Sequence, residues 1–174
     1  MRLFILLALL GSQLAFAAAA RAQCVPLNDL LAIGADPGVQ TSGKVVTDHV
    51  SVEWAYVGAT PTAKEAGWVF TPSGASAPTA RLLVRPQRPG QDVVLKTAQA
   101  SCLRDLRAEL KARKLTAQPV TCPNCEAVRY QSSNFDVTLY SQMKGEFPYV
   151  VVVHQVPVGM PPPAPAAAAG PKTP

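Results

Sequence analysis

The sequence predicts an α+β fold, with an antiparallel sheet built from two α-β-β-β(-β) repeats and two helices packed on one face. Three observations predict it. Two segments space their apolar residues as amphipathic helices do, and each is followed by short segments in which apolar and polar residues alternate, as in half-buried strands. Runs of strands separated by single helices favour an antiparallel over a parallel sheet. The helices then cover one face, and the other face meets water.

The first repeat, about residues 23–97, is expected to begin with a helix over residues 27–33. Gly34 and Pro37 follow, and both residue types disrupt helical backbone. A polar linker is expected to about Lys44. Strands are then predicted over residues 49–57, 67–71, 80–85 and 92–96. Four aromatic residues on one face of the first two strands are expected to pack in the core rather than line a groove: Trp54, Tyr56, Trp68 and Phe70.

The second repeat, about residues 98–158, is expected to begin with a longer helix over residues 98–114. Leu103, Leu106 and Leu110 recur there at helical spacing. Strands are predicted over residues 116–121, 126–131, 135–141 and 148–155. Sequence identity between the halves is poor, so the repeat is predicted from the pattern of elements alone.

Residues 1–22 have the features of a secretory signal peptide. Arg2 gives a positive start, residues 3–10 form an unbroken apolar run, and Ala20-Arg21-Ala22 fits a small-residue cleavage site. The apolar run is too short to span a bilayer core of ~30 Å as a helix. We therefore expect the mature chain to begin near Gln23 and to be soluble outside the cytoplasm, in the periplasm or secreted.

A lipid anchor and a membrane span are not expected. Bacterial lipoproteins place a small residue directly before the lipidated cysteine, whereas Gln23 precedes Cys24 here. After the leader, no apolar run approaches the ~18 residues that a spanning helix needs.

The remaining chain divides into a body and a tail. Residues 23–158 suit one α+β domain. Residues 159–174 hold only Pro, Ala, Gly, Lys and Thr after Met160, a composition typical of a disordered tail. Loss of Arg2 and Arg21 with the leader lowers the formal net charge from +5 to about +3, which is too mild to indicate nucleic-acid binding.

The four cysteines most simply form two disulfides, since disulfides persist in oxidising compartments. Three connectivities are possible. We favour Cys24–Cys102 with Cys122–Cys125, because Cys24 and Cys102 both lie near the starts of the predicted helices. Pairing of Cys102 with Cys122 or Cys125 stays open.

The Cys122-Pro123-Asn124-Cys125 segment allows two other interpretations. A thioredoxin-like redox pair needs its first thiolate at a helix N-terminus, and the alternation after Cys125 predicts a strand instead. A zinc knuckle needs a second pair of ligands, and Cys24, Cys102, His49 and His154 are dispersed in the sequence. We therefore expect no metal or other cofactor.

Two further patterns bear on function. Arg104, Arg107, Lys111 and Lys114 form a basic stripe on the second predicted helix, which is either a solvated face or a surface for an acidic partner or lipid head group. The chain has no nucleophile elbow, no glycine-rich phosphate loop and no clear carboxylate pair in its sequence, so we expect no catalytic residues.

One resemblance adds to this interpretation. The segments Val93-Val94-Leu95-Lys96-Thr97, residues 102–110 and Thr138-Leu139-Tyr140 resemble small exported bacterial proteins of unassigned activity, some of which carry two helix-plus-meander repeats. More distantly, the layout is similar to the tandem repeats of beta-lactamase inhibitor protein. The resemblance covers residues 24–157 and implies a binding surface on the sheet. The proline-rich tail and the segment 122–125 are not part of that pattern.

The sequence thus favours an exported, non-enzymatic binding or structural protein. Its partner would be an extracytoplasmic protein or an envelope component of unidentified chemistry. The alternative is an envelope thiol–disulfide protein that uses Cys122 and Cys125.

Overall fold

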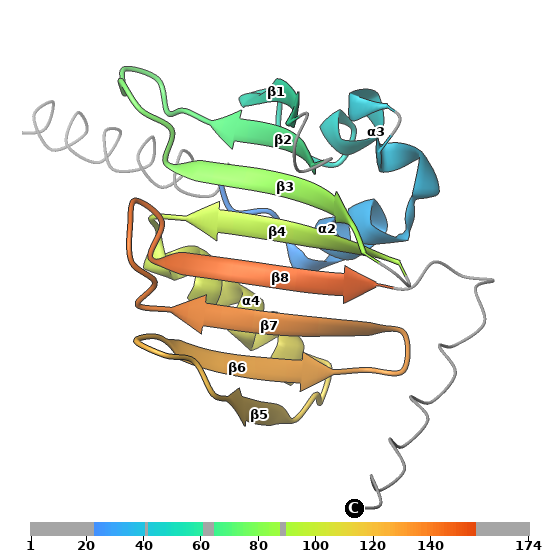
Figure 1. Ribbon diagram of the computed structural model, residues 1–174, viewed down its shortest axis with the longest axis vertical. Helices are drawn as coiled ribbons and strands as arrows, with labels where there is room; N and C mark the ends of the chain where they lie inside the picture. Colours follow the sequence, from blue (N-terminus) through green and yellow to red (C-terminus); the bar gives the residue numbers. More distant parts are fainter. Residues whose placement is uncertain (1–22, 41, 61–64, 88–89, 156–174) are drawn as a thin grey trace, which may run out of the picture.

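One eight-stranded antiparallel sheet forms the centre of the protein (Figure 1). The computed structural model describes residues 23–40, 42–60, 65–87 and 90–155. The expected signal peptide and the expected proline-rich tail lie outside these residues. The antiparallel α+β class predicted from the sequence is confirmed.

The elements follow one another as two helices with a 3₁₀ turn between them, four strands, one helix and four strands. The first half begins with helix α2 (Leu27–Ala35), the 3₁₀ turn η1 (Pro37–Gln40) and helix α3 (Gly43–Thr47). Its strands are β1 (Trp54–Thr60), β2 (Glu65–Phe70), β3 (Ala80–Pro86) and β4 (Gln91–Thr97). The second half has helix α4 (Ala100–Ala112), then β5 (Ala117–Val120), β6 (Glu126–Gln131), β7 (Phe135–Ser141) and β8 (Tyr149–Gln155).

The two four-stranded meanders join through their last strands. The order across the sheet is β1-β2-β3-β4-β8-β7-β6-β5, and β4 pairs antiparallel with β8 from Gln91↔Gln155 to Thr97↔Tyr149. In Figure 1, helices α2 and α4 lie behind the sheet. Helix α2 contacts the central strands β4 and β8, and α4 contacts β8. No helix within the described residues is long and apolar enough to cross a membrane.

The core lies between the helices and the inward-facing side chains of the sheet. Leu27, Leu30 and Ile33 of α2 are fully buried, as is Leu110 of α4, while Leu103 and Leu106 are almost so. Alternate strand residues meet them, among them Trp68, Leu82, Leu95, Leu139, Val151 and Val153. Burying one such side chain stabilises the fold by about 1.5–3 kcal/mol, so the helical spacing of the leucines explains why α4 docks with this face.

Polar contacts fix α2 at both ends. Glu109 Oε2 accepts a hydrogen bond from the Leu27 amide at 3.2 Å, which caps the start of α2 with a carboxylate from α4. Arg113, the C-cap residue of α4, donates a hydrogen bond to the side-chain oxygen of Asn28. At the other end, buried Gln91 of β4 donates through Nε2 to the carbonyls of Ile33, Gly34 and Asp36. The contacts of Glu109 and Gln91 provide hydrogen-bond partners for backbone groups at the two ends of α2.

The first strand and the linker before it differ from the prediction. Strand β1 begins at Trp54 rather than near His49, and Val52 is 98 % exposed. Its partner β2 ends at Phe70, opposite Trp54, and Pro72 follows in a turn, so residues 49–53 have no strand to pair with. The expected polar linker instead contains η1 and α3, whose Val46 is buried in the core.

Three of the four aromatic residues on β1 and β2 are core residues, as expected. Trp54, Trp68 and Phe70 are at most 4 % exposed, and Trp54 packs on Phe70 with ring centroids 5.7 Å apart. Tyr56 is the exception, at 51 % exposed, although its ring packs on Trp68 at 5.1 Å. Among the described strands β1 is at the edge of the sheet, so Tyr56 has no neighbouring strand on its outer side and is only partly covered, by Trp68 and by the backbone near Gly43.

Candidate functional site

The face of the sheet that the helices leave uncovered carries the candidate site. Strand register places its outward side chains on β3, β4, β8 and β7 in three rows across the sheet. The row nearest the β7–β8 loop holds Arg81, Lys96, Val150 and Tyr140. The middle row holds Leu83, Val94, Val152 and Thr138, and the far row holds Arg85, Asp92, His154 and Asp136. We call this surface the open face.

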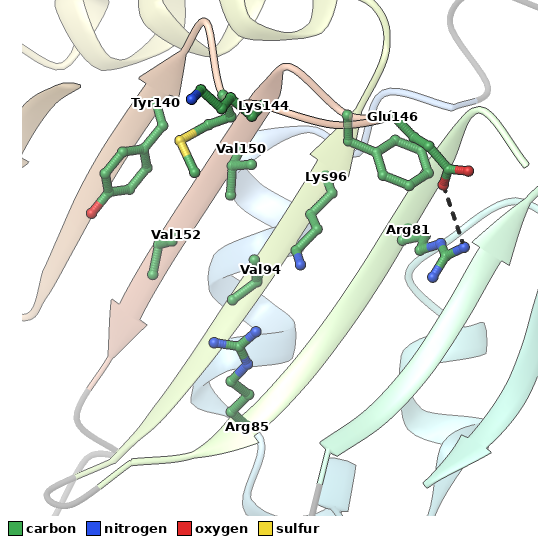
Figure 2. Close-up of a pocket in the computed structure, with 11 residues that line it drawn as sticks. Arg81, Arg85, Val94, Lys96, Tyr140, Lys144, Glu146, Val150 and Val152 are labelled. Carbon is green, nitrogen blue, oxygen red and sulfur yellow. Dashed lines mark ion pairs between the residues drawn. The ribbon is translucent and has the colours of Figure 1, made fainter. Parts of the chain in front are cut away.

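A groove of about 420 Å³ lies over the first two rows, within the ~300–1,000 Å³ range of small-ligand sites. Figure 2 shows Val94, Val150 and Val152 with Tyr140 and Lys144 on one side and Lys96, Arg85 and Arg81 on the other. The β7–β8 loop adds Met143, Lys144, Glu146 and Phe147 to the lining. That loop contains Gly145 at φ +110°, a backbone conformation that favours glycine.

The groove combines paired arginines with lysines that have no ion pair among the described residues. Arg81 lies 3.7 Å from Glu146 and stacks its guanidinium 5.3 Å from the centre of the Phe147 ring. Arg85 forms an ion pair with Glu65 of β2. Lys96 and Lys144 make no such contact within the described part of the chain. Two uncompensated ammonium groups therefore lie beside an apolar floor, which suits an anionic ligand with an apolar portion.

A second hollow of about 340 Å³ continues from the groove over the far row. Val152 lines both. His154 Nδ1 lies 2.7 Å from Asp92 Oδ1, and Arg129 of β6 forms an ion pair with Asp136. Because a carboxylate only accepts hydrogen bonds, Nδ1 of His154 donates in the Asp92 contact.

The cysteines lie away from the open face and pair as favoured from the sequence. Cys24 and Cys102 are at disulfide distance, with Cα atoms 5.1 Å apart, and connect the segment before α2 to the buried side of α4. Cys122 and Cys125 are also at disulfide distance, with Cα atoms 5.3 Å apart, in the turn between β5 and β6. Strand β6 begins directly after Cys125, so no helix N-terminus is available there to lower a thiol pKa.

The basic stripe is solvent-facing and remote from the groove. Arg104 and Lys111 are exposed on α4, Arg107 is half-buried, and Lys114 follows the end of the helix. Arg104 lies 3.7 Å from its neighbour Asp105. Because α4 covers the opposite side of the sheet, these cations do not join those of the open face (Figure 1).

Sequence reasoning missed the groove residues Arg81, Arg85, Lys96 and Lys144. One signal could have indicated them: the outward positions of the central strands mix cations with Leu83, Val94 and Val152 instead of carrying polar residues alone. Within residues 23–155 as described, no three His, Cys, Asp or Glu side chains are close enough together to hold a metal ion.

Comparisons with protein-family models, curated proteins and solved structures found no match for this chain.

Proposed function

We propose that this chain is an exported, non-enzymatic binding protein that holds an anionic ligand with an apolar portion in the groove of the open face. The observation that carries the proposal is the position of Lys96 and Lys144. Both residues line the groove, Lys96 beside the valine floor and Lys144 at the β7–β8 loop (Figure 2), and neither has an ion pair in the described residues. A carboxylate or phosphate would compensate these charges, and the ligand's apolar portion would pack on half-buried Val152 and on the apolar surface beside it.

Export has separate support. Two cysteine pairs at disulfide distance fit an oxidising compartment, where such bonds persist. The leader-like residues 1–22 agree with this location. We therefore place the binding activity in the periplasm or outside the cell, with an envelope component or an extracytoplasmic protein as the source of the ligand.

We also propose that residues 23–97 and 98–158 are tandem repeats of the kind suggested by the resemblance to exported helix-plus-meander proteins. The support is topological, because each half runs from a helix into a four-stranded meander and the two last strands pair at the centre. The groove crosses that seam, with β3 and β4 from one half and β7 and β8 from the other.

Thiol–disulfide exchange by Cys122 and Cys125 has less support. That chemistry depends on a stabilised thiolate, and the pair closes a turn between two strands.

The binding proposal is tested by titrating the full chain, produced in a bacterial periplasm, with octanoate and with its neutral counterpart octanamide. Backbone amide chemical shifts measured by NMR locate the binding. We expect octanoate to shift the amides of β4, β8 and the β7–β8 loop, and to bind more tightly than octanamide. The double variant Lys96→Gln with Lys144→Gln should lower octanoate affinity about fivefold, since two exposed charge contacts contribute about 0.5 kcal/mol each.

The matched control is Arg104→Gln with Lys111→Gln, which removes the same charge from the opposite layer. Its affinity for octanoate should equal that of the unchanged chain. Equal weakening in both double variants would show that net charge alone attracts the anion. That result, or shifts scattered over the whole surface, would overturn the proposal.

A further inference from the structure

We propose that the open face has two subsites of opposite charge and that its ligand is an extended peptide with an acidic group at one end and a cationic group at the other. This inference rests on the proposed binding function and names the class of its ligand. The first subsite is the groove beside Lys96 and Lys144. The second is the hollow beside Asp92, His154 and Asp136.

Continuity of the two hollows is the first step. They meet at Val152, in the middle row of the face. The first and last rows lie four residues apart along β8, from Val150 to His154. At a rise of about 3.3 Å per residue, this separates the two charged ends by about 13 Å. A ligand that reaches both subsites must therefore be elongated.

Opposite charge at the two ends is the second step. In the groove, Arg81 and Arg85 have carboxylate partners, whereas the two lysines do not. In the hollow, Arg129 compensates Asp136, and Arg85 of the far row is paired with Glu65. Asp92 contacts His154, so the formal charge of the hollow, with histidine counted as neutral at pH 7, is negative. Lys96 and Lys144 thus leave the groove net positive, while the hollow is net negative. The surface complements a ligand with a carboxylate at one end and an ammonium or guanidinium group at the other.

The apolar middle row is the third step, and it points to a peptide. Side chains at positions one, three and five of an extended peptide lie on the same side and have the same spacing as the three rows. The rows themselves are basic, apolar and net acidic in turn, with Val94 and Val152 in the middle. Arg85 of the third row is compensated by Glu65. An acidic, an apolar and a basic residue at alternate positions would match all three.

The edges of the sheet are less suited to such a peptide. Edge strand β1 has a bulge at Val57, where the register shifts between Tyr56 and Gly58. Edge strand β5 contains Pro119, which lacks an amide hydrogen. Both features interrupt the continuous backbone hydrogen bonding that an added strand requires. The open face, where side chains provide the recognition, is the better surface.

The test uses acetylated, amidated pentapeptides and the full chain with its cysteines oxidised. The parent peptides are glutamate–serine–leucine–serine–lysine and its reversed sequence. Both are used because the peptide can run in either direction along the sheet and still place its glutamate at the basic row and its lysine at the acidic row. Three variants replace lysine by norleucine, replace glutamate by glutamine, or move lysine to position four on the opposite side. Affinities come from NMR titration, and octanoate is measured alongside.

We expect the better parent peptide to shift amides at both ends of β8. Replacing lysine by norleucine, or moving it to position four, should weaken binding about threefold. Replacing glutamate, which faces both groove lysines, should weaken it about fivefold. In Asp92→Asn, which keeps an acceptor for His154, the norleucine and lysine peptides should bind equally. The matched control Asp105→Asn, on exposed α4, should leave the threefold difference intact.

Several outcomes overturn the proposal and distinguish its failure from that of the binding function. If octanoate binds the groove while the basic end of the peptide makes no difference, the two-subsite ligand is wrong and the anion-binding function stands. The two-subsite ligand is also wrong if Asp92→Asn leaves the preference for the lysine peptide unchanged. It is wrong as well if sedimentation shows a dimer that buries the open face. If neither octanoate nor any peptide binds there, both proposals fail.

Discussion

The two cysteine pairs should contribute very unequally to stability, because they close loops of very different length. Cys24 and Cys102 are 78 residues apart in sequence, whereas Cys122 and Cys125 are separated by 3. In the loop-entropy model, a bond across the longer separation stabilises the fold by about 4.5 kcal/mol and one across the shorter by about 1.6 kcal/mol. Replacing both members of each pair by alanine should therefore lower the free energy of unfolding by amounts that differ by about 3 kcal/mol.

The assay is urea denaturation of the two double variants and the unchanged chain, each with and without reductant. Cys102 is fully buried, so its replacement also removes packing contacts. Comparing the reduced variants with the reduced unchanged chain isolates that packing loss, because no loop is closed in either. Subtracting it leaves the contribution of the bond itself.

Equal losses in the two double variants, after this subtraction, would refute the reasoning. So would a larger loss for the pair at Cys122 and Cys125. Peptide mapping of the unreduced chain provides an independent readout, since a fragment that joins Cys102 to Cys122 or Cys125 would show that the pairing itself is wrong. A stability difference without the mapped Cys24–Cys102 fragment would likewise contradict the loop-entropy explanation.

Three other predictions follow from particular contacts. Gln91→Met should lower the free energy of unfolding by about 2–3 kcal/mol in urea denaturation, because it removes the buried amide donor of three carbonyls, whereas Gln118→Met on exposed β5 should change it by less than about 0.5 kcal/mol. Glu109→Ala should cost about 1 kcal/mol by removing the cap on the Leu27 amide, with Asp105→Ala near neutral; equal costs would contradict the capping role. The chain should not accelerate insulin reduction by dithiothreitol. If the unchanged chain does accelerate it and the Cys122→Ser variant does not, the thiol–disulfide function is supported instead.

Most strands of the sheet were predictable because apolar and polar residues alternate along them, and this alternation is visible within each segment. Strands β6, β7 and β8 lie within about a residue of the predicted ranges, since each buries alternate side chains against α4 or α2. The helix α4 was predictable for the same reason, through Leu103, Leu106 and Leu110. In these segments one periodic pattern and one buried face determine the structure.

The start of β1 was not predictable from its own pattern. Val50, Val52 and Trp54 alternate as a strand would, but a strand also needs a partner, and β2 ends opposite Trp54. Helix α3 was missed because its valines have low helix propensity. Tertiary contacts stabilise it: Val46 is buried, and the Tyr56 ring lies 3.4 Å from where a Cβ of Gly43 would be.

The candidate site was unpredictable for a different reason. Arg81 and Lys96 meet through the β3–β4 pairing, but Lys144 joins them only because β4 pairs with β8, and neither of these two strands indicates its distant partner in sequence. The sequence did indicate a basic stripe on α4, which is the local pattern of cations along one helix. The groove instead depends on pairing between strands that are distant in sequence, and the local spacing of apolar residues does not predict such pairing.

The burial of the groove floor connects stability to binding. Val94 and Val150 face away from the helices, yet they are only 2 % and 9 % exposed. Long Lys and Arg side chains line the same groove, together with Tyr140, Met143 and Phe147. Side chains of the Lys and Arg type lay their methylene groups on apolar surface and keep their charges in water. An anionic ligand that attracts the ammonium group of Lys96 would draw its stem away and take its place on the valines. The same side chains that protect the open face from water would then recognise the ligand, so replacing Lys96 by a short polar residue should expose the floor as well as weaken anion binding.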